Sequence, residues 1–285
     1  MKLPAFDYVR AHTPEQALAA FEQADADVRI LAGGQSLIAA LNFRLSEPTV
    51  LVDINHLPNW DQIEELDGVI RIGALVRHRQ ILESALIKSH LPLVSQAIVQ
   101  VAHPAIRNRG TIGGSVALAD PAAELPACAL ACGATVVTLG KHGERRILAD
   151  DFFLGLYETA LEEGELIRAI EFPKHSGSGS WHYFEEITRR QGDYAMAGLA
   201  ICQVSGNMPR VAWFGISDRP VRSSAAETAL ASPDTDQNSQ TKWQSIATDG
   251  VSIFGDVHAS EAMKKHLAGV LLKRAALSAC QRPTV

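Results

Sequence analysis

Two glycine pairs with flanking hydroxyl side chains are the residues whose types and spacing could best do chemistry. The first lies in Ala32-Gly33-Gly34-Gln35-Ser36-Leu37, between a β-branched stretch and a helical pattern, and the second in Arg109-Gly110-Thr111-Ile112-Gly113-Gly114-Ser115. Glycine lets a backbone approach a ligand closely, and free amides at the start of a helix bind anions. We therefore expect the two loops to meet around a diphosphate, each donating backbone N–H groups to it.

The loops lack the signatures of two common classes of nucleotide-binding protein. The phosphate loop of nucleotide hydrolases needs a lysine after its last glycine, and dinucleotide-binding nicotinamide folds need the pattern G-x-G-x-x-G. Neither pattern fits these loops. Each glycine pair taken alone is also typical of an ordinary turn, so the residues by themselves leave the ligand open.

The cysteines give no sign of a metal centre. The chain has four of them, which fit a reducing compartment: Cys128, Cys132, Cys202 and Cys280. The first two lie in an alanine-rich helical pattern and are interpreted as small buried hydrophobic residues. Because the chain has no close array of thiolates and no H-E-x-x-H pattern, we expect neither an iron–sulfur cluster nor another metal site on it. No catalytic triad is recognisable, and we assign no catalytic residue.

Composition excludes several other classes. The chain of 285 residues has a net charge of −6, which argues against a nucleic-acid partner because phosphate binding needs a basic face. No apolar run approaches the about 20 residues of a membrane span. Residues 1–10 lack the apolar stretch of a secretion signal. We therefore expect a cytoplasmic protein without a membrane span.

The elements that must position the loops alternate between strands and helices. Thr13 and Pro14 are typical of an N-cap and a first helical residue. A strand at 28–31, a helix through Leu45 and a strand at 49–54 predict a β-α-β unit around the first loop. Residues 103–123 are expected to form a loop. The other elements expected in this region are strands at 69–74, 134–139 and 165–172 and helices within 77–101 and 126–131.

A Gly/Ser tract at residues 175–180 is the clearest break in composition and predicts a flexible linker. We place a domain boundary there, with one domain at residues 1–176 and a smaller one at 177–285. Beyond it the patterns predict strands at 181–187, 195–204 and 211–216, a polar surface loop at 233–240 and a closing helix at 259–280. The whole pattern indicates an α+β fold.

Together with several further motifs in the same order, the two loops resemble the FAD-binding medium subunits of the molybdenum hydroxylase family, which includes xanthine dehydrogenases and carbon monoxide dehydrogenases. The resemblance runs from about residue 3 to the closing helix. The further motifs are Ile72-Gly73-Ala74 with His78, Asp120-Pro121-Ala122-Ala123-Glu124-Leu125-Pro126, Gly164-Glu165-Leu166-Ile167 and Gly192-Asp193-Tyr194-Ala195.

This resemblance implies a fold and a function. Residues 1–176 would form an FAD-binding domain of the vanillyl-alcohol-oxidase (PCMH) type, and residues 177–285 the small α+β C-terminal domain of flavin subunits. Substrate would be oxidised at a molybdopterin centre on a large subunit, and electrons would cross [2Fe–2S] clusters on a small subunit to reach FAD on this chain. An external acceptor (NAD, a quinone, a carrier protein or oxygen) would then receive them. The family also implies a dimer of heterotrimers.

The alternative is a free-standing FAD-dependent reductase or oxidase of the same FAD-domain superfamily. Such an enzyme needs a proton donor on the substrate side and an acid in its C-terminal domain, and the chain offers Ser176 to Ser180 and Glu185 or Glu186 only by residue type. Co-purification with larger and smaller subunits would distinguish the two hypotheses.

The resemblance also assigns contacts to the cofactor. Around the diphosphate it implies Arg29, Leu31, Ala32, Gly33, Gly34, Gln35, Ser36 and Leu37, with Gly110, Thr111, Gly113, Gly114 and Ser115 on the other side. Against the rings or the ribose it implies Val101, Ala102, Asp120, Glu124, Leu166, Ile167 and Tyr194. FAD is expected to bind non-covalently, because Gln35 rather than a histidine follows the first glycine pair.

Some of these residues have a purely structural alternative. Asp120 could simply stabilise the turn before Pro121. Leu166, Ile167 and Tyr194 could be ordinary core residues of strands. His78, between two arginines, is expected at the surface rather than as a catalyst.

Overall fold

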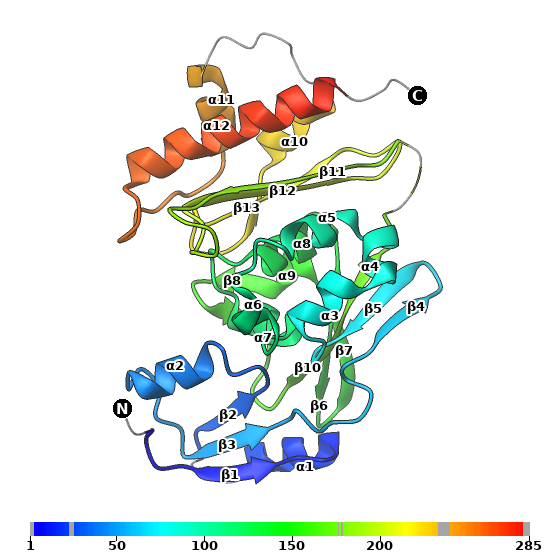
Figure 1. Ribbon diagram of the computed structural model, residues 1–285, viewed down its shortest axis with the longest axis vertical. Coiled ribbons are helices and arrows are strands. Elements are labelled where there is room, and N and C mark those ends of the chain that lie inside the picture. The colour runs from blue at the N-terminus through cyan, green and yellow to red at the C-terminus, as the bar shows by residue number, and fades with distance from the viewer. Residues whose placement is uncertain (1–2, 23–25, 176, 178, 233–239, 282–285) are drawn as a thin grey trace.

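The computed structural model of the chain describes residues 3–22, 26–175, 177, 179–232 and 240–281. From one end to the other it stacks a small three-stranded lobe, a five-stranded sheet covered by helices, a four-stranded sheet and a layer of helices (Figure 1). The expected mixture of helices and strands is therefore confirmed. Among the described residues, no helix combines the length and the apolar character that crossing a bilayer requires.

The small lobe is a parallel sheet in the order β1-β3-β2. Its crossover helix follows the first glycine loop, so the predicted β-α-β unit is confirmed. The helix ends at Asn42 rather than Leu45, because Arg44 adopts a left-handed conformation with φ of 60°. The N-cap prediction for Thr13 is also confirmed, since its hydroxyl accepts from Gln16 N–H. The elements of the lobe are β1 (Asp7–Arg10), α1 (Pro14–Ala19), η1 (Ala20–Glu22), β2 (Val28–Leu31), α2 (Leu37–Asn42) and β3 (Val50–Asp53).

The five-stranded sheet is antiparallel in the order β4-β5-β10-β6-β7. Its central strand β10 is buried along most of its length, which explains its nearly continuous apolar sequence. Gly143 begins β7 with a φ of 100°, which permits the tight turn that joins this strand to β6. The strands are β4 (Ile63–Leu66), β5 (Val69–Gly73), β6 (Thr135–Gly140), β7 (Gly143–Leu148) and β10 (Leu166–Pro173), with a separate small pair of β8 (Phe153–Gly155) and β9 (Glu158–Thr159).

Helices pack on this sheet, and they correct one prediction. Residues 103–123, expected to form a loop, contain two short helices. Pro104 occupies the first turn of one, and Thr111 caps the other with its hydroxyl while Ile112 and Val116 are buried. The burial of these apolar side chains thus outweighs the low helix propensity of Gly113 and Gly114. The helices are α3 (His78–Glu83), α4 (Ala85–His90), α5 (Pro92–Ala97), α6 (Pro104–Arg107), α7 (Ile112–Leu118), α8 (Glu124–Ala131) and α9 (Ala149–Phe152).

The C-terminal sheet, in the order β11-β12-β13-β14, lies between two helical layers (Figure 1). Along β12, Leu199 and Ile201 pack in the apolar cluster that includes α12, while Ala200 and Cys202 join the larger core of the N-terminal region. The predicted strands and the closing helix are confirmed. Residues 233–239 of the predicted surface loop lie outside the described residues, as does residue 176 at the predicted boundary. The elements are β11 (Trp181–Ile187), β12 (Ala197–Gln203), β13 (Arg210–Phe214), β14 (Val221–Arg222), α10 (Ser224–Ala231), α11 (Gln240–Thr248) and α12 (Glu261–Cys280).

Candidate functional site

The two glycine loops lie against each other. A Cβ atom built on Gly33 would be 2.5 Å from the carbonyl oxygen of Arg109 and 2.9 Å from Cα of Gly110. No side chain fits between the loops, so glycine is required at position 33. The predicted meeting of the loops is therefore confirmed at the level of the backbone.

The first loop, residues 31–37, presents unused hydrogen-bond donors. Within the described part of the chain, none of the backbone N–H groups of residues 33–37 has an acceptor. Gly34 adopts a φ of 74°, which only glycine reaches without strain and which helps to turn these amides in one direction. The hydroxyl of Ser36 does not cap α2 and is exposed. This loop can therefore donate several hydrogen bonds to an anion at the start of α2.

The second loop, residues 109–115, differs because its amides are already bonded. Gly113 N–H donates to Ala74 O at 2.9 Å, and Ile112 N–H donates to Val76 O at 3.1 Å. Gly114 N–H donates to the Thr111 hydroxyl at 3.1 Å. The expectation that the second loop also donates backbone amides to the ligand is wrong for these positions, because Ile112 and Gly113 are bonded to the segment that follows β5 and Gly114 to Thr111. The Thr111 side chain is buried and its hydroxyl caps α7, whereas Ser115 is partly exposed.

Two polar side chains that the sequence did not single out connect the loops. The Asn55 amide donates to the carbonyl oxygens of Leu31 at 3.3 Å and Ala32 at 2.9 Å. Arg77 donates both to Asn55 Oδ1 and to the carbonyl oxygen of Arg109. This Arg77–Asn55 link holds the first loop against the second. Neither residue belongs to a recognisable local motif, so only the folded structure reveals the link.

A group of titratable side chains includes the predicted Asp120, Glu124 and Tyr194. Burial raises the pKa of Glu124 to about 8, and the neighbouring Glu186 carboxyl contributes to the rise. Burial also raises the pKa of Tyr194, as do the Asp120 and Glu124 carboxyls near it. The Asp120 carboxylate accepts from Ala122 N–H at 2.9 Å, which confirms its role in the turn.

Tyr194 is not a core residue. Its side chain is 61% exposed and it lies between β11 and β12, outside any strand. The alternative of an ordinary core aromatic is therefore wrong for Tyr194. A second exposed aromatic, Tyr157, donates to Asp120 at 3.5 Å and was not predicted.

Within the described part of the chain, the other residues predicted to contact the cofactor form no hydrogen bond with either glycine loop. Leu166, Ile167 and Val101 are buried in the core, and Ala102 has a φ of 43°. Arg29 is exposed and forms an ion pair with Asp27 at 3.4 Å.

His78 is buried, which corrects the expectation of a surface residue. Its ring lies against Gly110, where an added Cβ would be 3.0 Å from Nδ1. Burial lowers the pKa of His78 to about 4. His78 is therefore a neutral packing residue under the second loop.

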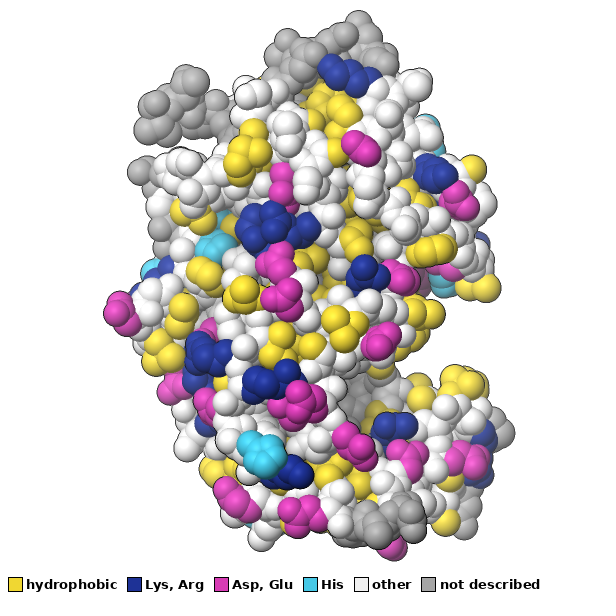
Figure 2. Space-filling model, turned by 180° about the vertical axis from the view of Figure 1, so that it is seen from behind, with side chains coloured by type: hydrophobic (Ala, Val, Ile, Leu, Met, Phe, Trp, Pro, Cys, Tyr) yellow, Lys and Arg dark blue, Asp and Glu magenta, His cyan; other side chains and the backbone are white. Residues whose placement is uncertain are grey.

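The molecule is hollowed between the small lobe and the rest of the chain (Figure 2). The lobe contributes the first loop, which is the part with unused amides, and the second loop belongs to the body of the molecule. A dinucleotide fits this arrangement because its diphosphate needs amide donors and its ring systems need a recess.

The comparisons with known proteins agree with this arrangement. Residues 4–175 match the family model described as the FAD binding domain in molybdopterin dehydrogenase, and residues 182–279 match the C-terminal domain of the carbon monoxide dehydrogenase flavoprotein. A subunit of the 6-hydroxypseudooxynicotine dehydrogenase complex of Paenarthrobacter nicotinovorans is 38% identical over 99% of this chain and 97% of its own length. The carbon monoxide dehydrogenase medium chain of Hydrogenophaga pseudoflava is 32% identical over 98% of both chains.

Solved structures show the same likeness. A chain of carbon monoxide dehydrogenase from Hydrogenophaga pseudoflava superposes with a TM-score of 0.90 at 33% identity, over 98% of this chain and 99% of the other. A chain of quinoline 2-oxidoreductase from Pseudomonas putida 86 also gives 0.90 at 33% identity, over 99% of both. The chain belongs to the family of FAD-binding medium subunits of the molybdenum hydroxylases.

Proposed function

We propose that this chain is the flavin relay of a three-subunit molybdenum hydroxylase. It takes electrons from [2Fe–2S] clusters on a small subunit and delivers them to an external acceptor. Substrate is oxidised at a molybdopterin centre on a large subunit. The names of the relatives support this proposal, because they are medium chains or subunits of larger dehydrogenases, such as the nicotine 6-hydroxylase medium subunit. They favour a subunit over a free-standing FAD-dependent reductase or oxidase.

The observation that carries the proposal is the set of unused amides at residues 33–37, facing a second loop too close for any side chain at Gly33. We assign the diphosphate of FAD to these amides and to the hydroxyl of Ser36, with Thr111 and Ser115 on the opposite side. The shape of the first loop depends on Leu31, Ala32, Gln35 and Leu37. The second loop can approach it closely because of Gly110, Gly113 and Gly114. The exposed Arg29 lies on β2 of the lobe and supplies positive charge there when it leaves its ion pair with Asp27.

The other predicted residues are assigned to the rings and sugars. Asp120 and Glu124 accept hydrogen bonds from ribose hydroxyls, and Tyr194 covers one face of the isoalloxazine. Val101, Ala102, Leu166 and Ile167 complete the apolar wall. Bound FAD supplies the redox chemistry, while these residues hold it, exclude water and set its surroundings. The relay itself requires no general acid or base, and no catalytic residue is assigned.

The finer features of the assembly are also proposals. We place the domain boundary at residues 176–177, between the two matched ranges. Two heterotrimers associate into a hexamer, as the family resemblance implies. The buried cysteines Cys128, Cys132 and Cys202 form no disulfide in the structure, which supports a reducing compartment such as the cytoplasm.

Affinity purification of the full chain from its native cells tests the proposal. We expect a yellow complex in which FAD absorbance accompanies two further polypeptides, one with iron and one with molybdenum. Reduction of the flavin by the organic substrate should require both partners. A chain that is purified alone with FAD and reduces a substrate without partners would contradict the relay and favour the free-standing enzyme.

A further inference from the structure

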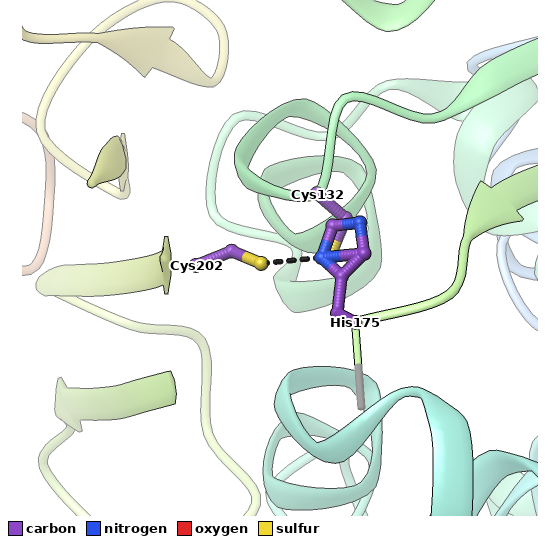
Figure 3. Close-up of side chains that lie close together, drawn as sticks. All are labelled: Cys132, His175 and Cys202. Carbon is purple, nitrogen blue, oxygen red and sulfur yellow. Dashed lines mark hydrogen bonds between the residues drawn. The ribbon is translucent and has the colours of Figure 1, made fainter. Parts of the chain in front are cut away.

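A second cluster of chemically active side chains lies away from the flavin site. Sγ of Cys132, Sγ of Cys202 and an imidazole nitrogen of His175 all lie within 4.8 Å of one another (Figure 3). Their residues are 2%, 2% and 5% exposed. Nδ1 of His175 lies 2.5 Å from Sγ of Cys202. The three side chains therefore converge in a buried space that solvent barely reaches.

The three residues come from separate segments of the fold. Cys132 is the C-cap of helix α8, His175 lies two residues after strand β10, and Cys202 lies on β12 of the C-terminal sheet. Their distance along the chain explains why the sequence predicted no metal site: the thiolates are not closely spaced until the two sheets are assembled.

A fourth donor stands beside the cluster. His182 on β11 is the direct cross-strand partner of Cys202 on β12, so both side chains project from the same face of the sheet. Its Nε2 atom is buried and has no hydrogen-bond partner among the residues that the structure describes. The imidazole rings of His175 and His182 are also neighbours, with their centroids 6.3 Å apart.

Two thiolates and two imidazoles are a typical ligand set for tetrahedral zinc. Zn–S bonds of about 2.3 Å and Zn–N bonds of about 2.0 Å put the ligands of a tetrahedral site roughly 3.3–3.8 Å apart. The donor atoms of Cys132, His175 and Cys202 already lie within 4.8 Å of one another, so small side-chain movements suffice for these three. His182 joins them by rotation of its side chain, which projects from the same face of the sheet as Cys202. A divalent cation also balances two thiolate charges, which makes burial of the whole group favourable.

We propose that Cys132, His175, Cys202 and His182 bind one structural zinc ion. The ion joins the end of α8, the segment that follows β10 and the C-terminal sheet. It thus fixes the C-terminal domain against the FAD domain at the beginning of the linker. Because Glu124 begins α8 and Cys132 is its C-cap, the same helix connects the zinc site to the group around Tyr194.

The test begins with metal analysis of the full-length chain, produced without a histidine tag and purified under reducing conditions. We expect about one zinc per chain, bound through two sulfurs at about 2.3 Å and two nitrogens at about 2.0 Å in X-ray absorption at the zinc edge. Cobalt(II) substitution should give ligand-field bands at wavelengths beyond the flavin absorption.

Single substitutions provide the comparison. Cys132→Ser and Cys202→Ser should each lower the zinc content at least ~10-fold, and His182→Gln should speed its removal by a chelator. The matched control is Cys128→Ala, which removes another fully buried thiol from the same helix but leaves the cluster intact. It should retain the full zinc content.

Several results would overturn the proposal. One is a folded wild-type chain that neither contains zinc nor takes it up from zinc chloride after reduction. Another is a Cys132–Cys202 disulfide, found by peptide mapping of alkylated protein. Zinc that persists in both serine variants, or an absorption spectrum without sulfur ligands, would also overturn it. The wild-type measurements decide the question even if the variants fail to fold.

Discussion

The two glycine loops look alike in sequence, yet the structure gives them opposite properties. In the first, residues 31–37, the amides of residues 33–37 have no acceptor within the described structure. This loop is held in place by the Asn55 side chain, which donates to the carbonyl oxygens of Leu31 and Ala32. In the second, residues 109–115, the backbone amides already donate hydrogen bonds to Thr111 and to the segment after β5. A glycine pair with flanking hydroxyls therefore does not by itself show whether a loop offers donors or only allows close packing.

The difference assigns separate roles. The first loop is a donor surface, and changes there should affect ligand affinity more than folding. The second is a rigid support, and changes there should affect folding more than affinity. Substitutions in each loop can test this division, which disappears if the two loops respond alike.

The largest effect should come from Gly113→Ala. The new Cβ would lie 2.5 Å from Cβ and 2.6 Å from the carbonyl oxygen of Ala74, so backbone must move. We expect a loss of about 3 kcal/mol in the free energy of unfolding, measured by urea denaturation of the flavin-free chain. Gly114→Ala is the matched control, because its Cβ meets only the Thr111 hydroxyl at 2.9 Å. Equal losses in both variants would contradict the rigid-support role.

Gly33→Ala should act mainly on the cofactor. Its Cβ would collide with the Arg109 carbonyl and push the loops apart, which misplaces the unused amides. We expect FAD to bind about 100-fold more weakly, or about 2.7 kcal/mol. Fluorescence titration of the flavin-free chain measures this affinity. Gly177→Ala, whose Cβ meets nothing closer than 3.8 Å, is the control and should bind FAD normally.

Asn55→Ala should have a smaller effect in the same direction. It removes the side chain that connects Arg77 to the first loop, but leaves every amide of residues 33–37 in place. We expect roughly a 10-fold loss of FAD affinity, or about 1.4 kcal/mol. Gln62→Ala removes an exposed amide that bonds only Asn59 in the described structure and is the control. Normal FAD affinity in Asn55→Ala would show that the loop keeps its shape without this link.

The last effect depends on pH and is expected away from the loops, at Glu124. Because its pKa rises from 4.5 to about 8 in the folded chain, the folded state binds a proton that the unfolded state releases. The stability it contributes is present below pH 4.5 and is lost as the pH rises through about 8. In thermal melts of the flavin-free chain between pH 5 and 9, we expect Glu124→Gln to show a smaller decline than wild type. An identical decline in the two proteins would contradict the raised pKa.

The sequence predicted well what depends on local pattern. The β-α-β unit, the Thr13 cap and the strands β11, β12 and β13 all follow from periodicity and turn residues within short segments. It failed where distant contacts decide the structure. The helix at Ile112–Leu118 forms because Ile112 and Val116 are buried in the core and Gly113 packs on Ala74. Nothing in the sequence around residues 112–118 indicates these distant contacts.

The same limit applies to side chains that act across the fold. Asn55 and Arg77 carry no signature of their own, since their partners lie in loops far away in the chain. Cys132, His175 and Cys202 come together only when three separate segments pack. Tyr194 was predicted from a motif, but its exposure comes from its position between two strands rather than within one.

The most direct test of the account is a pair of calorimetric titrations of the flavin-free, full-length chain with FAD and with riboflavin, which lacks the diphosphate and adenosine. If the amides of residues 33–37 bind the diphosphate, FAD should bind at least about 100-fold more tightly than riboflavin, and Gly33→Ala should remove most of that difference. Similar affinities for the two ligands, or an unchanged ratio in Gly33→Ala, would contradict the central claim.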